Sequence, residues 1–307
     1  MQKELSGKVA IITGANQGFG LEVARKFVLA GADVMLCARN AALLQEAHAD
    51  LIKLAAHDQK VFAEAADVSV EADVQALVSA TISKLGGCHI LVNNAGIYGP
   101  KGEIESVDWA EWIKAIEINV FGSILMCRAI LPHFKAQRYG KILQLSGGGA
   151  TNPMPRISAY AVSKAAIVRF AETLAEEVRG TGIDVNAIAP GALNTRMLDE
   201  VLEAGPEKVG KTFYERSLKQ KESGGAPLGR GVELALFLAS AASDGITAKL
   251  ISAVWDDWEH WPEHLDDLSS SDVYTLRRIA GRDRGFEWGD KLATLINRLE
   301  LGSLVVA

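Results

Sequence analysis

The stretch from Val9 to Gly20 reads VAIITGANQGFG, and it decides the fold. Its first five residues are apolar or β-branched, as in a strand that is buried on both faces, and a helix with apolar spacing follows the glycine-rich turn. Glycines at 14, 18 and 20 let the backbone turn sharply and approach a pyrophosphate, while the amino end of the helix offers free N–H groups. This order of strand, turn and helix predicts a dinucleotide-binding unit.

The rest of the chain repeats this alternation of short apolar runs and longer segments with helical spacing. We predict seven strands, at residues 9–13, 33–37, 61–64, 90–93, 141–145, 184–188 and 250–254. Helices are predicted near residues 19–30, 41–55, 71–85, 108–136, 159–179 and 231–240. Such an alternation is typical of a parallel sheet covered on both faces, so we expect an α/β, Rossmann-type doubly wound sheet.

The expected domain organisation has one large domain and a tail. Residues 1–255 are predicted to form the dinucleotide-binding and catalytic domain. Within it, residues 194–227 are rich in glycine and proline, which suits a mobile lid. Residues 256–307 change in composition, with acidic residues and tryptophans followed by arginines. We interpret them as a C-terminal extension that packs over a substrate mouth or at a subunit boundary.

Charge and composition exclude several classes of protein. The 307 residues carry a formal net charge of -6, whereas a nucleic-acid binder normally has a basic face. Only three cysteines occur, Cys37, Cys88 and Cys127, so we expect no disulfide framework and a cytoplasmic location. No uninterrupted apolar run approaches the roughly 20 residues that cross a bilayer, and the first residues lack the pattern of a signal peptide. We therefore expect no membrane partner.

Four further motifs follow the glycine turn in order along the chain. Asp67 and Val68 follow the third strand, Asn93-Asn94-Ala95-Gly96 ends the fourth, Tyr160 and Lys164 lie on a helix, and Pro190, Gly191 and Thr195 follow the sixth strand. With the opening Thr-Gly-x-x-x-Gly-x-Gly spacing, residues 5–254 resemble the short-chain dehydrogenase/reductase family. The resemblance implies an NAD(P)-dependent oxidoreductase that moves a hydride between a nicotinamide and a carbonyl or secondary alcohol.

The predicted cofactor contacts combine the glycine turn, the four motifs and the end of the second strand. They are Gly14, Asn16, Gln17, Gly18, Phe19, Gly20, Arg39, Asp67, Val68, Asn94, Ala95, Gly96, Tyr160, Lys164, Pro190, Gly191 and Thr195.

The residues that end the second strand bear on the choice of cofactor. A carboxylate there would accept hydrogen bonds from a ribose diol but repel a 2′-phosphate. The sequence has Cys37-Ala38-Arg39-Asn40 instead, and a guanidinium can hold a phosphate with two hydrogen bonds. NADP(H) is therefore favoured over NAD(H). In the alternative interpretation, Arg39 only begins a solvated helix.

The predicted chemistry is centred on Tyr160. Hydride transfer to a carbonyl leaves an alkoxide that needs a proton, and a phenol can supply it. Lys164 lies one helical turn later, and its ammonium should lower the pKa of that phenol. By resemblance, Lys164 also binds the nicotinamide ribose. Asn119, which lies 41 residues before Tyr160, would by resemblance hold a water that continues a proton relay to Lys164.

This sequence departs from the family's pattern at the substrate-binding serine. It normally lies thirteen residues before the tyrosine, and that position is Gly147. Ser146 stands one residue earlier and begins a glycine run that could let the backbone present its hydroxyl. We favour Ser146 as the donor to the substrate oxygen, with Ser158 as a weaker candidate. In the alternative, Ser146 only ends the strand.

Two sequence patterns near the C-terminus resemble binding sites. His260 and His264 have the spacing of zinc ligands on one helical face, but Pro262 between them disfavours a regular helix, so we predict no metal. The tryptophans at 255, 258 and 261 are interpreted as anchors for the extension.

These observations favour an NADPH-dependent carbonyl reductase, or the reverse alcohol dehydrogenase, acting on a small molecule. Members of this family commonly form dimers or tetramers, so the resemblance implies a homo-dimer or homo-tetramer. One alternative is an epimerase or dehydratase that retains its cofactor. The other is a sensor or scaffold that binds NADP(H) without efficient chemistry because of the change at Ser146 and Gly147.

Overall fold

Seven parallel strands form one sheet in the order β3-β2-β1-β4-β5-β6-β7. The protein is described here by a computed structural model that covers residues 3–286. The strands are β1 Val9–Thr13, β2 Asp33–Ala38, β3 Val61–Ala65, β4 Ile90–Asn93, β5 Gly140–Leu145, β6 Ile183–Ala189 and β7 Leu250–Ser252. The predicted doubly wound Rossmann-type sheet is confirmed, and the strand order reverses between β1 and β4. At such a switch point the neighbouring loops diverge and leave a crevice at the carboxyl ends of the strands.

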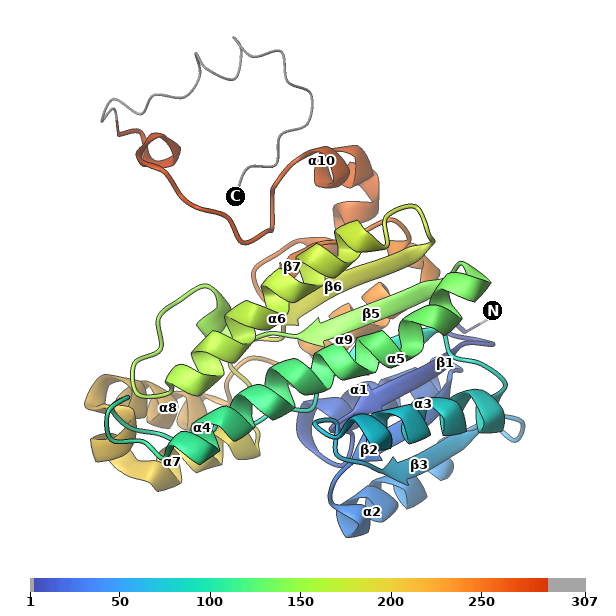
Figure 1. Ribbon diagram of the computed structural model, residues 1–307, viewed down its shortest axis with the longest axis horizontal. Coiled ribbons are helices and arrows are strands. Elements are labelled where there is room, and N and C mark those ends of the chain that lie inside the picture. The colour runs from blue at the N-terminus through green and yellow to red at the C-terminus, as the bar shows by residue number, and fades with distance from the viewer. Residues whose placement is uncertain (1–2, 287–307) are drawn as a thin grey trace. The chain divides into compact units, whose positions relative to one another are not determined.

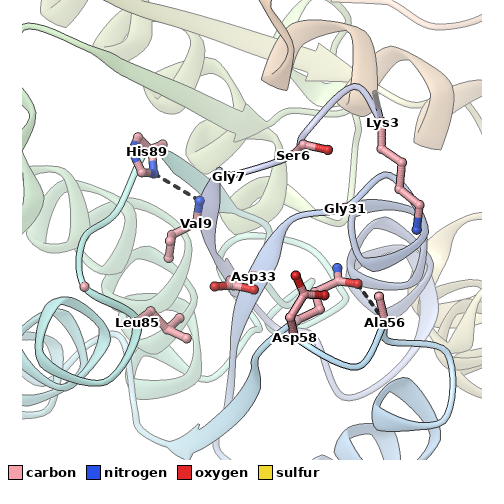
Figure 2. A pocket seen from close by; sticks show the side chains of 12 residues that line it. Lys3, Ser6, Gly7, Val9, Gly31, Asp33, Ala56, Asp58, Leu85 and His89 are labelled. Carbon is pink, nitrogen blue, oxygen red and sulfur yellow. Dashed lines mark hydrogen bonds between the residues drawn. The ribbon is translucent and has the colours of Figure 1, made fainter. Parts of the chain in front are cut away.

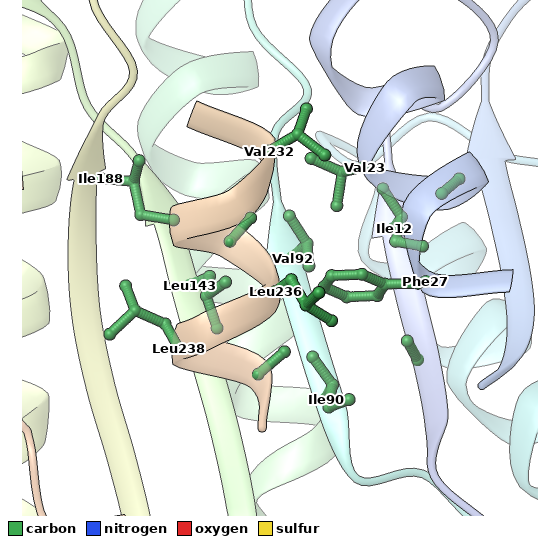
Figure 3. Packing of buried hydrophobic residues seen from close by; sticks show 14 of the residues in the cluster. Ile12, Val23, Phe27, Ile90, Val92, Leu143, Ile188, Val232, Leu236 and Leu238 are labelled. Atoms are coloured by element: carbon green, nitrogen blue, oxygen red, sulfur yellow. The ribbon is translucent and has the colours of Figure 1, made fainter. Parts of the chain in front are cut away.

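Helices cover both faces of the sheet (Figure 1). One face carries α1 Gly18–Leu29, α2 Ala41–Ile52 and α9 Leu228–Ala239, and the other carries α3 Glu71–Leu85, α4 Trp109–Ile116, α5 Gly122–Gln137 and α6 Ser158–Glu177. Figure 3 shows how α1 and α9 meet over the sheet, with Phe27 of α1 beside Leu236 of α9 above Val92. This apolar layer fixes the amino end of α1 relative to the carboxyl ends of the central strands.

The segment expected to be a mobile lid is helical. Residues 194–227 contain α7 Arg196–Val209 and α8 Lys211–Ser223, drawn in gold in Figure 1. The glycines that suggested a mobile lid mark the points where these helices are interrupted. Gly205 has a non-helical backbone inside α7, Gly210 separates the two helices, and Gly224 ends α8 in the left-handed conformation. Glycine is favoured at all three because these positions have positive φ.

The first compact unit extends past the boundary that we placed after residue 255. The chain divides into two compact units, Met1–Thr275 and Leu276–Ala307. Trp258 and Trp261 are buried in the hydrophobic core of the first unit, so residues 256–275 belong to it. Trp255, by contrast, is 87% exposed and does not anchor this segment. Residues 287–307 of the predicted extension lie outside the described residues.

The segment that holds His260 and His264 is a 3-10 helix, Trp258–His264, with Pro262 inside it. His260 pairs with Asp257 at 3.0 Å, and His264 lies 4.0 Å from Asp267. Within residues 3–286, no cluster of three His, Cys, Asp or Glu residues could hold a metal ion.

One helical stretch, Trp109–Gln137, is long and apolar enough to cross a membrane by length and composition. Half of its most apolar 18-residue segment is buried inside the protein, and the core helix of a soluble protein can have the same length and composition. The stretch consists of α4 and α5, joined by a π-helical segment, Glu117–Phe121. Its length thus reflects two helices that pack against α3 and α6.

Candidate active site

Two hollows lie at opposite ends of the sheet. A cleft of about 1680 Å³ runs along the carboxyl ends of the strands. A smaller hollow of about 470 Å³ lies at the amino ends, where Val9 and Asp33 begin β1 and β2, and Figure 2 shows it between Lys3, Asp58 and His89. Open α/β sheets bind ligands at the carboxyl ends of their strands. The large cleft is therefore the candidate active site.

The glycine turn forms one end of this cleft. Gly14 and Gly18 have φ of +63° and +58°, a backbone region that disfavours residues with a Cβ. A Cβ on Gly20 would lie 2.3 Å from Asn94 Nδ2, so only glycine allows α1 to approach the loop after β4. Gln17, which precedes α1, makes no side-chain cap. The amino end of α1 is thus open toward the cleft and suits the pyrophosphate of a dinucleotide.

Thr13 and Asn94 join the ends of β1 and β4. The Thr13 hydroxyl accepts hydrogen bonds from the backbone N–H groups of Asn94 and Ala95, at 3.0 and 3.1 Å. The Asn94 amide donates to the carbonyl oxygens of Thr13 and Gly14, at 2.9 and 3.1 Å. Asn94 therefore holds the glycine turn in place, in addition to lining the cleft.

Arg39 lines the cleft at the end of β2. Its Nη1 lies 3.8 Å from Asp67 Oδ2, and its side chain is half exposed. Burial alone would raise the pKa of Asp67, but hydrogen bonds from Ser69 and the charge of Arg39 hold that pKa below its usual value. Asp67 does not line the cleft, whereas its neighbour Val68 does. The guanidinium is thus only loosely paired and stays available to a ligand.

Tyr160 lies in the first turn of α6 and lines the cleft. Its ring packs against that of Tyr98, with centroids 4.6 Å apart. Burial raises the pKa of the Tyr160 phenol above its ordinary value, and Tyr98 adds to the effect. We expected Lys164 to lower the pKa of Tyr160. The structure indicates a raised pKa instead, because desolvation of the phenolate dominates. Burial therefore favours the neutral form of this phenol.

Lys164 is buried on the same face of α6. Its Nζ donates a 2.6 Å hydrogen bond to the carbonyl oxygen of Leu145 and lies 5.5 Å from the centre of the Tyr160 ring. Burial lowers the pKa of Lys164 to about 8. The ammonium therefore remains mostly charged at neutral pH, and the end of β5 holds it beside the tyrosine.

Asn119 lies behind the wall of the cleft, in the π-helical segment between α4 and α5. Its Oδ1 accepts from the Ile97 N–H at 2.8 Å, and its Nδ2 donates to the Ile97 carbonyl and to Ser163 Oγ, at 2.8 and 2.9 Å. Such π-helical turns occur frequently at functional sites. Here the amide joins the loop after β4 to α6, one turn from Tyr160.

The structure shows how Gly147 and the two candidate serines, Ser146 and Ser158, lie relative to Tyr160. Gly147 is extended, and a Cβ built on it would lie 2.4 Å from the Tyr160 hydroxyl, so position 147 faces that hydroxyl. Ser146 also lines the cleft; its buried Oγ has no hydrogen-bond partner within the described part of the chain. Ser158 does not line the cleft, and its Oγ accepts from Trp112 Nε1 at 3.0 Å.

The structure brings most of the predicted site residues together. All of the predicted catalytic and cofactor residues line the cleft except Gly20, Asp67 and Asn119, which lie directly behind it. Sequence reasoning missed Tyr98, although it stands two residues after Gly96. It also missed Arg216 and Lys219 of α8, which line the cleft from the segment that was expected to be a mobile lid. No motif marks these two, because their place depends on how α8 packs.

Comparison with known proteins gives consistent results. A family model described as short chain dehydrogenase matches residues 8–205. The chain is 33% identical over 251 residues to the 7alpha-hydroxysteroid dehydrogenase of Escherichia coli K12, covering 81% of this chain and 93% of that protein.

Two solved structures illustrate the structural similarity. The 3-ketoacyl-(acyl-carrier-protein) reductase from Brucella melitensis, complexed with NADH, has a TM-score of 0.70 and 33% identity, covering 81% of this chain and 97% of that one. A gluconate 5-dehydrogenase from Burkholderia cenocepacia, in complex with NADP and tartrate, has a TM-score of 0.71 and 26% identity, covering 82% and 95%.

Proposed function

Because the chain belongs to the short-chain dehydrogenase family and is an NAD(P)-dependent oxidoreductase of alcohols or carbonyl compounds, we propose that it is an NADPH-dependent carbonyl reductase with Tyr160 as its proton donor. The observation that carries the proposal is the cleft itself. Tyr160 and Lys164 line it together with the glycine turn and Arg39, so one continuous hollow joins a proton donor to a dinucleotide site.

The residues at the glycine end fit the cofactor. Gly14 and Gly18 allow the backbone to approach a pyrophosphate, and the uncapped amino end of α1 offers N–H donors to it. When bound, the dinucleotide supplies the hydride. Arg39 supports the choice of NADPH, because it offers a planar pair of donors where a carboxylate would repel the 2′-phosphate.

Tyr160 serves as the acid in this proposal. Burial keeps its phenol protonated at neutral pH, which suits donation to the alkoxide that develops on a reduced carbonyl. Lys164 holds a positive charge near the phenol and stabilises the phenolate left after donation. Asn119 acts by positioning, since its amide bonds fix the loop after β4 against α6.

Ser146 supports the proposal as the donor to the substrate oxygen. A buried hydroxyl without a partner carries a desolvation cost, and a substrate carbonyl in the cleft would relieve it. Gly147 offers no such group, because it has no side chain.

The test is steady-state reduction of a ketone panel with NADPH and with NADH. Tyr160→Phe is expected to abolish turnover while NADPH still binds. Arg39→Ala is expected to lower the preference for NADPH about tenfold, since a charge-assisted hydrogen bond contributes roughly 1.5–3 kcal/mol. Arg25→Ala is the matched control, because Arg25 pairs with Glu22 outside the cleft. Equal efficiency with both cofactors, unchanged by Arg39→Ala, would refute the NADPH assignment.

One observation favours a second candidate, a protein that senses NADP(H) without efficient turnover. The position that faces the Tyr160 hydroxyl, Gly147, lacks the side chain that could bind a substrate oxygen beside it. Tight NADPH binding with no turnover across carbonyls and alcohols would support this candidate.

The location and assembly of the protein belong to the same proposal. Cys37, Cys88 and Cys127 are free and buried, in keeping with a reducing cytoplasm. A homo-dimer or homo-tetramer remains a prediction that sedimentation of the full chain would test.

A further inference from the structure

The lining of the cleft carries more positive charge than the sequence as a whole would suggest. Among residues 3–286, five basic side chains line the cleft, and Asp256 is the one acidic lining residue. The full sequence, by contrast, has a formal net charge of -6. Arg39 and Lys164 are accounted for by the cofactor end and the proton donor. The remaining basic residues are Arg196, Arg216 and Lys219.

Within the described part of the chain, two of these three cations have no acidic partner. Arg196 lies 3.4 Å from Glu200, which offsets its charge. Arg216 and Lys219 of α8 have no carboxylate within ion-pair distance among residues 3–286. Arg216 instead lies over the ring of Phe213, at 5.3 Å from its centre.

Other cations of the same helix behave differently. Lys211, at the start of α8, lies 3.9 Å from Glu215, and Lys221 pairs with Asp199. Neither lines the cleft. Lys211 and Lys221, which lie outside the cleft, are thus paired with carboxylates. Arg216 and Lys219, which line it, have no such partner among residues 3–286.

Arg216 also lies close to the proposed chemistry. Its charge acts on the Tyr98 hydroxyl, where it opposes the larger effects of burial and of Glu200 that raise the pKa of Tyr98 to about 12. The Tyr98 ring in turn packs on Tyr160 at 4.6 Å. The loop before α6 is also joined to α7, because Arg156 donates to the Glu207 carbonyl oxygen at 2.6 Å. α7 and α8 therefore stand at the Tyr160 end of the cleft.

We propose that Arg216 and Lys219 bind an anionic group of the substrate, so that the enzyme acts on carbonyl or hydroxyl compounds that carry a carboxylate or a phosphate. This inference rests on the proposed function, whose substrate it narrows. A planar guanidinium and a neighbouring ammonium are the usual partners of carboxylate and phosphate oxygens. Binding the anion on α8 leaves the reacting carbon free to approach Tyr160.

The kinetic test uses two matched pairs of ketones that differ mainly in charge. Acetoacetate is compared with methyl acetoacetate, and dihydroxyacetone phosphate with dihydroxyacetone, so the two pairs distinguish a carboxylate from a phosphate. The full-length enzyme is expected to prefer the anionic member of at least one pair in kcat/KM. Arg216→Gln and Lys219→Gln should each reduce that preference about tenfold, mainly through KM, as expected for loss of a charge-assisted hydrogen bond.

The matched control is Lys211→Gln, which removes the same charge from the same helix outside the cleft and should leave the preference unchanged. A neutral ketone preferred in both pairs, or an anionic preference that survives the Arg216→Gln/Lys219→Gln double substitution, would overturn the inference. Either result would leave the carbonyl reductase proposal intact, provided that the neutral ketones turn over.

A binding measurement separates this inference from the proposed function. Calorimetric titration of the full chain with acetoacetate and with dihydroxyacetone phosphate needs no turnover. Binding that is lost in the double variant and kept in Lys211→Gln would support the anion site even if no ketone were reduced, and the reductase proposal would then fail alone. Binding that the double variant leaves unaltered would overturn the anion site.

Discussion

Gly147→Ala should remove most of the activity while leaving the fold intact. A Cβ at this position would lie 2.4 Å from the Tyr160 hydroxyl, whereas ordinary contacts begin near 3.4 Å. The hydroxyl must therefore move by about 1 Å, and a displacement of that size in a reacting group can cost roughly 100-fold in rate. Because the contact is with the far end of a side chain, moving it off its rotamer should cost only about 0.5–1.5 kcal/mol of stability.

The assay is kcat for ketone reduction, followed by NADPH absorbance, with urea unfolding as the check on stability. Gly148→Ala is the matched control, because a Cβ at position 148 meets no atom within 4 Å. In the Tyr160→Phe background the alanine should have a much smaller effect, since the contacting oxygen is gone. Turnover by Gly147→Ala near that of the wild type, or an equal loss in Gly148→Ala, would refute this geometry.

Three further predictions concern the serine, the lysine and the tryptophans. Ser146→Ala should lower kcat/KM about tenfold or more in the same assay, while Ser158→Ala leaves it unchanged; near-normal turnover by Ser146→Ala would make Ser146 a bystander. Burial lowers the pKa of Lys164 from 10.5 to about 8, so its buried charge destabilises the fold below about pH 8. Between about pH 8 and 10.5 the folded protein has lost this proton while the unfolded chain still keeps it. The destabilisation therefore decreases as pH rises through this range. The stabilising effect of Lys164→Met, measured by denaturant unfolding, should therefore shrink by up to about 3 kcal/mol over that range, and a pH-independent difference would contradict it. Trp258→Ala should cost about 3–5 kcal/mol in the same measurement and Trp255→Ala almost nothing, since the first is buried and the second is 87% exposed; equal effects would place the core boundary elsewhere.

The tertiary structure changed the interpretation of several local signals. Glycines between residues 194 and 227 suggested a mobile lid, and in the structure they mark the ends and the kink of two helices. The three tryptophans were interpreted as anchors, and Trp258 and Trp261 do pack in the core of the main unit, whereas Trp255 is exposed. Composition alone does not reveal whether a glycine interrupts a helix or ends it. It also does not reveal which surface a tryptophan ring covers.

The sequence by itself determined the sheet and the cofactor end, because both depend on local patterns. Apolar runs specify buried parallel strands, and Gly14, Gly18 and Gly20 permit the backbone path that brings the turn between β1 and α1 close to Asn94. The spacing already placed Lys164 and position 147 near Tyr160, but only the tertiary structure decided which other side chains join them. Tyr98 packs on the Tyr160 ring, and Arg216 lines the same cleft from a helix 56 positions later in the chain. Such contacts depend on how separate elements pack, and no spacing along the chain encodes them.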